Sequence, residues 1–176
     1  MEHSSFDFRQ TKDQLIAEVL TRYPSLFSRW ARGADIIQFK HSPWTKLSKS
    51  ISQSRLALIT TGGVHLRSQP PFDMQDSAGD PTFREIPADI SVSDLTITHN
   101  YYNHSDADKD INIIFPIERL KDLERSKDIG STNDRHFSFM GHIKDHHREA
   151  LIYETAPRVA AELIKDGVDI VILTPA

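Results

Sequence analysis

RLALITTGG, residues 55–63, determines the fold class of this chain. An apolar, partly β-branched run ends at two glycines, which predicts a buried strand over residues 55–61 followed by a tight turn. DIVILT, residues 169–174, has the same character and predicts a final strand. Between these two runs, the pattern predicts further strands at residues 95–99, 111–115 and 136–140.

Segments with helical spacing alternate with these strands. Residues 117–127 form an amphipathic pattern, and a helix from Thr155 as N-cap to about Asp166 would stop at Gly167. Strand–helix alternation is typical of an α/β fold with a mainly parallel sheet and flanking helices, in a Rossmann-like three-layer arrangement. We therefore expect a helical N-terminal extension over residues 1–42, followed by an α/β domain over residues 43–176.

A long segment, residues 64–94, is rich in proline, aspartate, serine and glycine. Segments of this length without secondary structure are usually functional or disordered. Because this one also carries aromatic and charged residues, among them Phe72, Phe83 and Arg84, we expect an ordered, packed loop.

The composition of the 176 residues excludes several classes of function. Hydrophobic residues make up 38 % and charged residues 26 %, and the net charge is −4, so nothing indicates a nucleic-acid partner. The first ten residues are polar, unlike a signal peptide, and the longest apolar run, residues 168–173, is too short to span a membrane. We expect a cytoplasmic protein. The absence of cysteine excludes disulfides, thiolate zinc sites and cysteine nucleophiles within these residues.

The carboxyl ends of the predicted parallel strands mark the expected binding edge. Residues 60–65, 139–141 and 174–176 should converge there. Gly62 and Gly63 follow a strand, so their N–H groups could receive a carboxylate, or the pair could simply form a turn that needs positive φ. The residues alone leave both interpretations open.

Two charged or titratable side chains lie near this edge in the sequence. His65 could act as a general acid or base, orient a substrate carboxylate, or serve as a structural hydrogen-bonding group. Arg84 could pair with a substrate carboxylate in fork geometry, although an ion pair with Asp80 or Asp89 that anchors the loop is slightly favoured.

Two polar clusters in the sequence are candidate metal sites. The pair His142 and His146, with His147 beside it, could chelate zinc on a helix, but no third ligand is apparent. The other cluster is more typical of a solvated face, and its members are His99, His104, Asp106, Asp108 and Asp110. We therefore predict no metal site.

Several motifs, in order, resemble the B subunits of glycine, sarcosine, betaine and D-proline reductases. The resemblance covers roughly residues 43–176 and leaves residues 1–42 unexplained. The motifs are LITTGGVHL (58–66), GD (79–80), FR (83–84), IP (86–87), SD (105–106), DIN (110–112), FPI (115–117), FSFMG (137–141), ETAP (154–157), DGVD (166–169) and ILT (172–174).

This resemblance implies reductive cleavage of the C–N bond of an amino acid or related amine. In that family, selenocysteine or cysteine follows the final strand, so the redox-active residue is expected at the position after Ala176, and the sequence is expected to be truncated just before it. A pyruvoyl group on a partner subunit activates the amine. We expect a homo-oligomer, because a truncated sheet would self-associate. The resemblance implies a substrate site whose residues are Thr61, Gly62, Gly63, His65, Arg84, Gly141 and Thr174, with His65 as the one candidate catalytic residue.

Two other functions remain open at this point. The same scaffold could serve as a non-catalytic binding or interaction protein, whose exposed terminal strand pairs with another chain. A His/Asp metal-dependent hydrolase is the weaker alternative.

Overall fold

The computed structural model describes residues 8–32, 41 and 44–176, in two compact units. The first unit comprises Met1–Ser48 with Asn100–Asn103. Its described helices are α1 (Phe8–Arg22) and α2 (Pro24–Ala31). Proline suits the first position of α2 because its fixed φ is helical and its missing N–H would have no intrahelical partner there. The domain boundary predicted at residues 42 and 43 lies outside the described residues.

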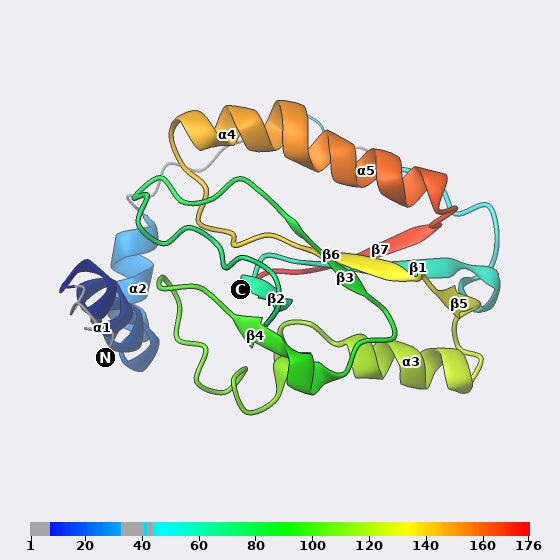
Figure 1. Ribbon diagram of the computed structural model, residues 1–176, viewed down its shortest axis with the longest axis horizontal. Helices are drawn as coiled ribbons and strands as arrows, with labels where there is room; N and C mark the ends of the chain where they lie inside the picture. Colours follow the sequence, from blue (N-terminus) through cyan, green and yellow to red (C-terminus); the bar gives the residue numbers. More distant parts are fainter. Residues whose placement is uncertain (1–7, 33–40, 42–43) are drawn as a thin grey trace. The chain divides into compact units, whose positions relative to one another are not determined.

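The second unit is built around strand β1 (Arg55–Thr60) (Figure 1). One edge of β1 pairs in parallel with β7 (Ile170–Thr174). The other edge pairs in parallel with β5 (Ser131–Thr132) and then β6 (Arg135–Ser138). Strand β3 (Arg84–Pro87) completes the sheet, antiparallel to β6. The sheet is therefore mixed, with its parallel part at the centre, and it confirms the α/β class; the Rossmann-like three-layer arrangement stays a prediction.

A second, two-stranded sheet pairs β2 (Val64–Leu66) with β4 (Leu95–Ile97) in antiparallel register. Together with β3 and the short 3₁₀ helix η2 (Val92–Asp94), these strands give residues 64–94 an ordered structure, as expected. Another 3₁₀ helix, η1 (Ile51–Gln53), precedes β1.

The strand predicted at residues 111–115 is wrong. This segment begins with a 3₁₀ helix, η3 (Ile111–Ile113). The carboxylate of Asp110 accepts a hydrogen bond from the backbone N–H of Asn112 at 3.0 Å. Such a cap satisfies a donor at the start of a helical turn, and it favours the turn over an extended backbone.

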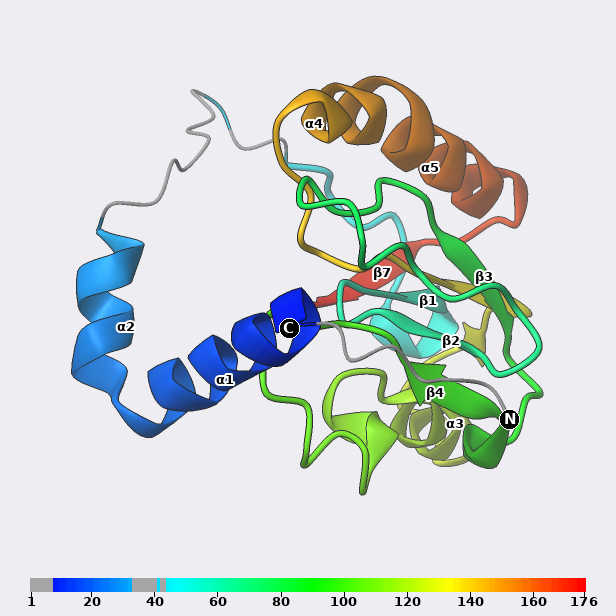
Figure 2. The ribbon, with the colours of Figure 1, turned by 60° about the vertical axis from the view of Figure 1, so that its left-hand side comes forward.

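Two helical segments flank the sheet, on opposite sides (Figures 1 and 2). Helix α3 (Ile117–Arg125) lies where the sequence predicts a helix. On the other side, Val159 and Leu163 pack with Ala57, Phe137 and Phe139 in one buried cluster. No helix in the described part of the chain is long and apolar enough to cross a membrane.

The long helical segment opposite α3 starts nine residues earlier than predicted. It comprises α4 (His146–Ala150), the π-helical turn η4 (Leu151–Thr155) and α5 (Ala156–Lys165). Thr155 is helical, with φ −79° and ψ −42°, so its prediction as an N-cap is wrong. Pro157 lacks an N–H and its ring would clash with the carbonyl four residues before it; the wider π turn directly before it relieves that conflict.

Candidate functional site

The carboxyl ends of β1, β6 and β7 meet at one edge of the sheet. The N–H of Thr61 donates to the carbonyl oxygen of Thr174 at 3.1 Å, and the N–H of Gly63 donates to that of Phe139 at 2.9 Å. The N–H of Ala176 donates to Thr61 Oγ1 at 3.2 Å. The three segments expected to converge therefore do lie together, and we call this group the strand-end cluster.

The two glycines after β1 form a tight turn. Gly63 has φ +71°, and a Cβ there would lie 2.4 Å from the carbonyl oxygen of Thr98. The N–H of Gly62 donates to Thr60 Oγ1 at 3.0 Å. Because the N–H groups of both glycines point to protein acceptors, the geometry matches the turn interpretation rather than an anion cradle.

Gly141 and Thr174 complete the strand-end cluster. Gly141 has φ +81°, and its Cβ would lie 2.6 Å from the carbonyl oxygen of Thr61, so glycine lets the chain after β6 cross the end of β1. The hydroxyl of Thr174 donates to the carbonyl oxygen of Ile114 at 2.7 Å. Gly141 is exposed, whereas Thr61 and Thr174 are half-buried, so the cluster is accessible from solvent.

His65 is buried in β2, and both of its ring nitrogens are engaged. Nδ1 lies 2.8 Å from the carbonyl oxygen of Leu66, so it carries the proton and donates. Nε2 then accepts from the hydroxyl of Thr98, also at 2.8 Å. Burial lowers the pKa of His65 below its usual value and keeps the ring neutral. This geometry is that of a structural hydrogen-bonding group.

Arg84 holds the proline-rich part of the long segment. Its guanidinium donates to the carbonyl oxygens of Pro70 and Pro71, each at 2.9 Å, and lies 3.7 Å from the carboxylate of Asp80. It also stacks 4.2 Å from the ring centroid of Phe72, against whose ring His65 packs edge-on. The structure thus places both Arg84 and His65 against the ring of Phe72. The contacts of Arg84 anchor the loop, which is the role that the sequence slightly favours for this residue.

The predicted polar cluster around His104 does not gather as one ligand set. His104 pairs with Asp108 at 2.8 Å, and Asp106 pairs with Lys109 at 2.8 Å. Asp110 caps η3, and burial lowers the pKa of His99 to about 4. These side chains are therefore engaged in separate local interactions and do not form one set of metal ligands.

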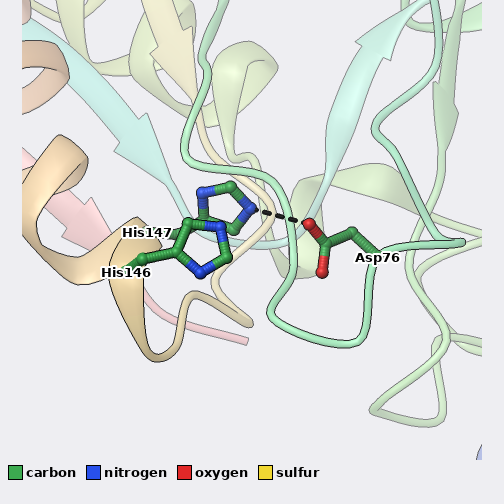
Figure 3. A group of neighbouring side chains, drawn as sticks. All are labelled: Asp76, His146 and His147. Atoms are coloured by element: carbon green, nitrogen blue, oxygen red, sulfur yellow. Dashed lines mark hydrogen bonds and ion pairs between the residues drawn. The ribbon is translucent and has the colours of Figure 1, made fainter.

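One group of possible metal ligands was missed by sequence reasoning. Asp76 Oδ2 lies 2.9 Å from Nε2 of His147, and the rings of His146 and His147 have centroids 4.0 Å apart (Figure 3). The histidines were identified as candidates, but Asp76 is 71 residues from His147 and no sequence signal pairs them.

A cleft of about 640 Å³ lies beside β4, η3 and α3. Charges of both signs line it, from Arg67, Asp108, Lys109, Asp110, Glu118 and Arg119. Its lining includes none of the substrate-site residues predicted from the sequence.

Comparison with known proteins identifies the relatives of this chain. A profile of the family described as glycine/sarcosine/betaine reductase selenoprotein B matches residues 30–176. No solved structure matches the chain.

Curated relatives are subunits of reductase complexes. D-proline reductase subunit gamma of Acetoanaerobium sticklandii is 37% identical over 131 residues, which are 74% of this chain and 52% of that protein. Glycine reductase complex component B subunit gamma of Carboxydothermus hydrogenoformans is 28% identical over 77% of this chain and 31% of its own length. Sarcosine reductase complex component B subunit beta of Peptoclostridium acidaminophilum is also 28% identical, over 77% of this chain and 31% of its own length. The chain thus aligns with about half of the first of these relatives and slightly less than a third of the other two.

Proposed function

Because the chain belongs to the glycine/sarcosine/betaine reductase selenoprotein B family, we propose that it is a subunit of a complex that reductively cleaves the C–N bond of an amino acid or related amine. The family similarity over residues 30–176 carries this proposal, and the named reductase subunits among the relatives support it. The whole complex, its substrate and its partner subunit are part of the proposal.

We assign the substrate-binding edge to the strand-end cluster, with Thr61, Gly141 and Thr174 at its centre. Its place supports this assignment, because ligands of open α/β sheets usually bind outside the carboxyl ends of the strands. Gly62 and Gly63 shape the turn beside it. In this proposal His65 and Arg84 are positioning residues that hold residues 64–87, since their polar atoms are engaged with protein partners.

The redox group in this proposal is a selenocysteine or cysteine outside these 176 residues, which contain no cysteine. It would supply the electron pair that replaces the broken C–N bond. The position after Ala176, assigned by resemblance, fits this role because the N–H of Ala176 bonds to Thr61 at the strand-end cluster. A pyruvoyl group on a partner subunit would activate the amine. Cytoplasmic location and self-association stay predictions.

A titration tests the binding half of the proposal. Glycine, sarcosine, betaine and D-proline are each added to the purified chain, and binding is followed by calorimetry or ligand-observed NMR. We expect saturable binding of at least one compound, weakened about tenfold or more by Gly141→Ala, because a misplaced backbone alters site geometry.

Gly167→Ala is the matched control for that variant. Gly167 also has positive φ, +71°, but nothing lies within 4 Å of the Cβ that alanine would add, and it is not part of the strand-end cluster. Equal loss of binding in both variants would show a general effect of strain, and no saturable binding of any of the four compounds would count against the assigned edge.

A non-catalytic interaction protein on the same scaffold is the second candidate, and one surface favours it. Leu173 in β7 is 69% exposed, although its register with Ile59 places it on the same face of the sheet as the buried Ala57. An exposed apolar side chain on a sheet face suits contact with another chain. Leu173→Asp should then weaken association with a reductase partner subunit and leave amine binding unchanged; loss of association without any amine binding by the parent chain would favour this second candidate.

A further inference from the structure

Two segments far apart in the sequence are held together near the start of α4. Gly79 and Ile143 form an antiparallel bridge, and the N–H of Lys144 donates to the carbonyl oxygen of Ala78 at 2.8 Å. Gly79 has φ +90°, and a Cβ there would lie 1.5 Å from the carbonyl oxygen of His142. This close backbone contact brings the loop that carries Asp76 against the first residues of α4.

Three potential metal ligands result from this contact (Figure 3). One ligand atom each from Asp76, His146 and His147 lies within 4.8 Å of the other two. Asp76 Oδ2 and His147 Nε2 lie 2.9 Å apart. Asp76 and His147 are half-buried, and His146 is exposed. In the described part of the chain, no other group of three such ligands lies as close together.

The distances fit coordination after a small adjustment. Bonds from zinc to imidazole nitrogen and carboxylate oxygen are about 2.0–2.2 Å, so neighbouring ligand atoms in a site lie roughly 2.9–3.5 Å apart. The separation between Asp76 and His147 is already in this range. The ligand atom of His146 lies within 4.8 Å of the other two, and its exposed side chain can change rotamer to close any remaining gap.

A backbone hydrogen bond fixes the orientation of the Asp76 carboxylate. Its second oxygen, Oδ1, accepts the backbone N–H of Ala78 at 2.8 Å, which fixes its orientation in the way that outer hydrogen bonds orient metal ligands.

We propose that Asp76, His146 and His147 form a binding site for a divalent cation of the zinc class. Two imidazoles and one carboxylate suit borderline first-row ions, whereas Mg²⁺ and Ca²⁺ prefer sites made of oxygen ligands alone. Three protein ligands leave a coordination position for water or another small molecule. Bound metal would lock the loop that carries Asp76 onto α4. The site is independent of the proposed reductase function.

Zn²⁺ titration of the purified chain tests this site. We expect one Zn²⁺ per chain by calorimetry, and a visible Co²⁺ absorption band when Co²⁺ takes its place. His146→Gln and Asp76→Asn should each weaken binding roughly tenfold or more, since each removes a ligand. The exposure of His146 means that its replacement should leave the fold unchanged, which thermal unfolding without metal checks.

His104→Gln provides the matched control. His104 also pairs with an aspartate, Asp108, at 2.8 Å, but it is not part of the three-ligand group. This variant should bind Zn²⁺ like the parent chain. The proposal is overturned if no stoichiometric Zn²⁺ binding occurs, or if His104→Gln weakens binding as much as His146→Gln does. Either result would leave amine binding at the strand-end cluster unaffected.

Discussion

Acidification should destabilise this fold, and part of the effect should come from the buried histidine His136 in β6. Its side chain is fully buried, and its Nδ1 accepts the N–H of Leu58 at 3.1 Å. The ring proton therefore belongs on Nε2, which has no hydrogen-bond partner among the described residues. Burial, with a smaller contribution from Lys121, lowers the pKa of His136 to about 4.

The size and sign of the effect follow from that pKa. An unfolded histidine titrates near 6.5, so between about pH 6.5 and pH 4 the unfolded chain binds a proton that the folded chain does not. The stability contributed by the neutral ring is complete above about pH 6.5 and is lost as the pH falls toward 4. At 1.36 kcal/mol per pKa unit, the loss between pH 7 and pH 4.5 is about 2–3 kcal/mol.

Urea denaturation at these two pH values measures the loss, and His136→Asn isolates it. Asparagine cannot titrate, and its carbonyl oxygen can still accept the N–H of Leu58. His99, whose pKa is also lowered to about 4, contributes in both proteins and cancels in the comparison. The parent chain should lose about 2–3 kcal/mol more than the variant. The same pH dependence in both proteins would refute the assignment of a neutral, buried ring.

Three further predictions concern stability. Gly141→Ala should cost about 1–3 kcal/mol in urea denaturation, because the residue has φ +81° and its new Cβ would meet the carbonyl oxygen of Thr61. Arg135→Gln should cost about 1 kcal/mol, less at high salt, since Arg135 Nε lies 2.7 Å from Asp166. NMR titration should then show the pKa of Asp166, held at about 2 chiefly by that hydrogen bond, move up toward its usual value. Leu58→Ala should lower the urea midpoint by the equivalent of about 2–5 kcal/mol, because a fully buried side chain leaves a cavity.

The elements that the sequence predicted best are the buried strands of the central sheet. β1 and β7 each coincide with an apolar run close to glycine, with Gly62 and Gly63 after β1 and Gly167 before β7, and such runs have few alternatives in an α/β chain. The equally apolar residues 111–115 fold differently, because the cap supplied by Asp110 decides the local conformation. Hydrophobic periodicity gives no information about this capping hydrogen bond.

The helix before β7 shows that local sequence signals can predict the wrong helix start. Thr155 followed by Pro157 is typical of a helix start, yet helical structure begins at His146. A π turn accommodates the proline, and the pairing of the loop at Gly79 with Ile143 positions the residues just before α4. Both causes depend on contacts outside the local sequence.

The candidate sites also differ in how far the sequence could predict them. The strand-end cluster could be predicted, because parallel strands bring their carboxyl ends to one edge wherever they lie in the sequence. The structural roles of His65 and Arg84 were among the alternatives that the sequence left open, but their partners at Thr98, Pro70 and Pro71 could not be predicted, because the tertiary fold brings them together. The pairing of Asp76 with His147 depends on a backbone contact between distant loops, which sequence patterns do not report.

Association with a reductase partner subunit tests the central claim most directly. The purified chain and the other subunits of a D-proline, glycine or sarcosine reductase are mixed at micromolar concentrations, and the masses of the species formed are measured by analytical ultracentrifugation. We predict a complex of defined stoichiometry. Independent sedimentation of the chain with every such partner would contradict its assignment as a subunit of a reductase complex.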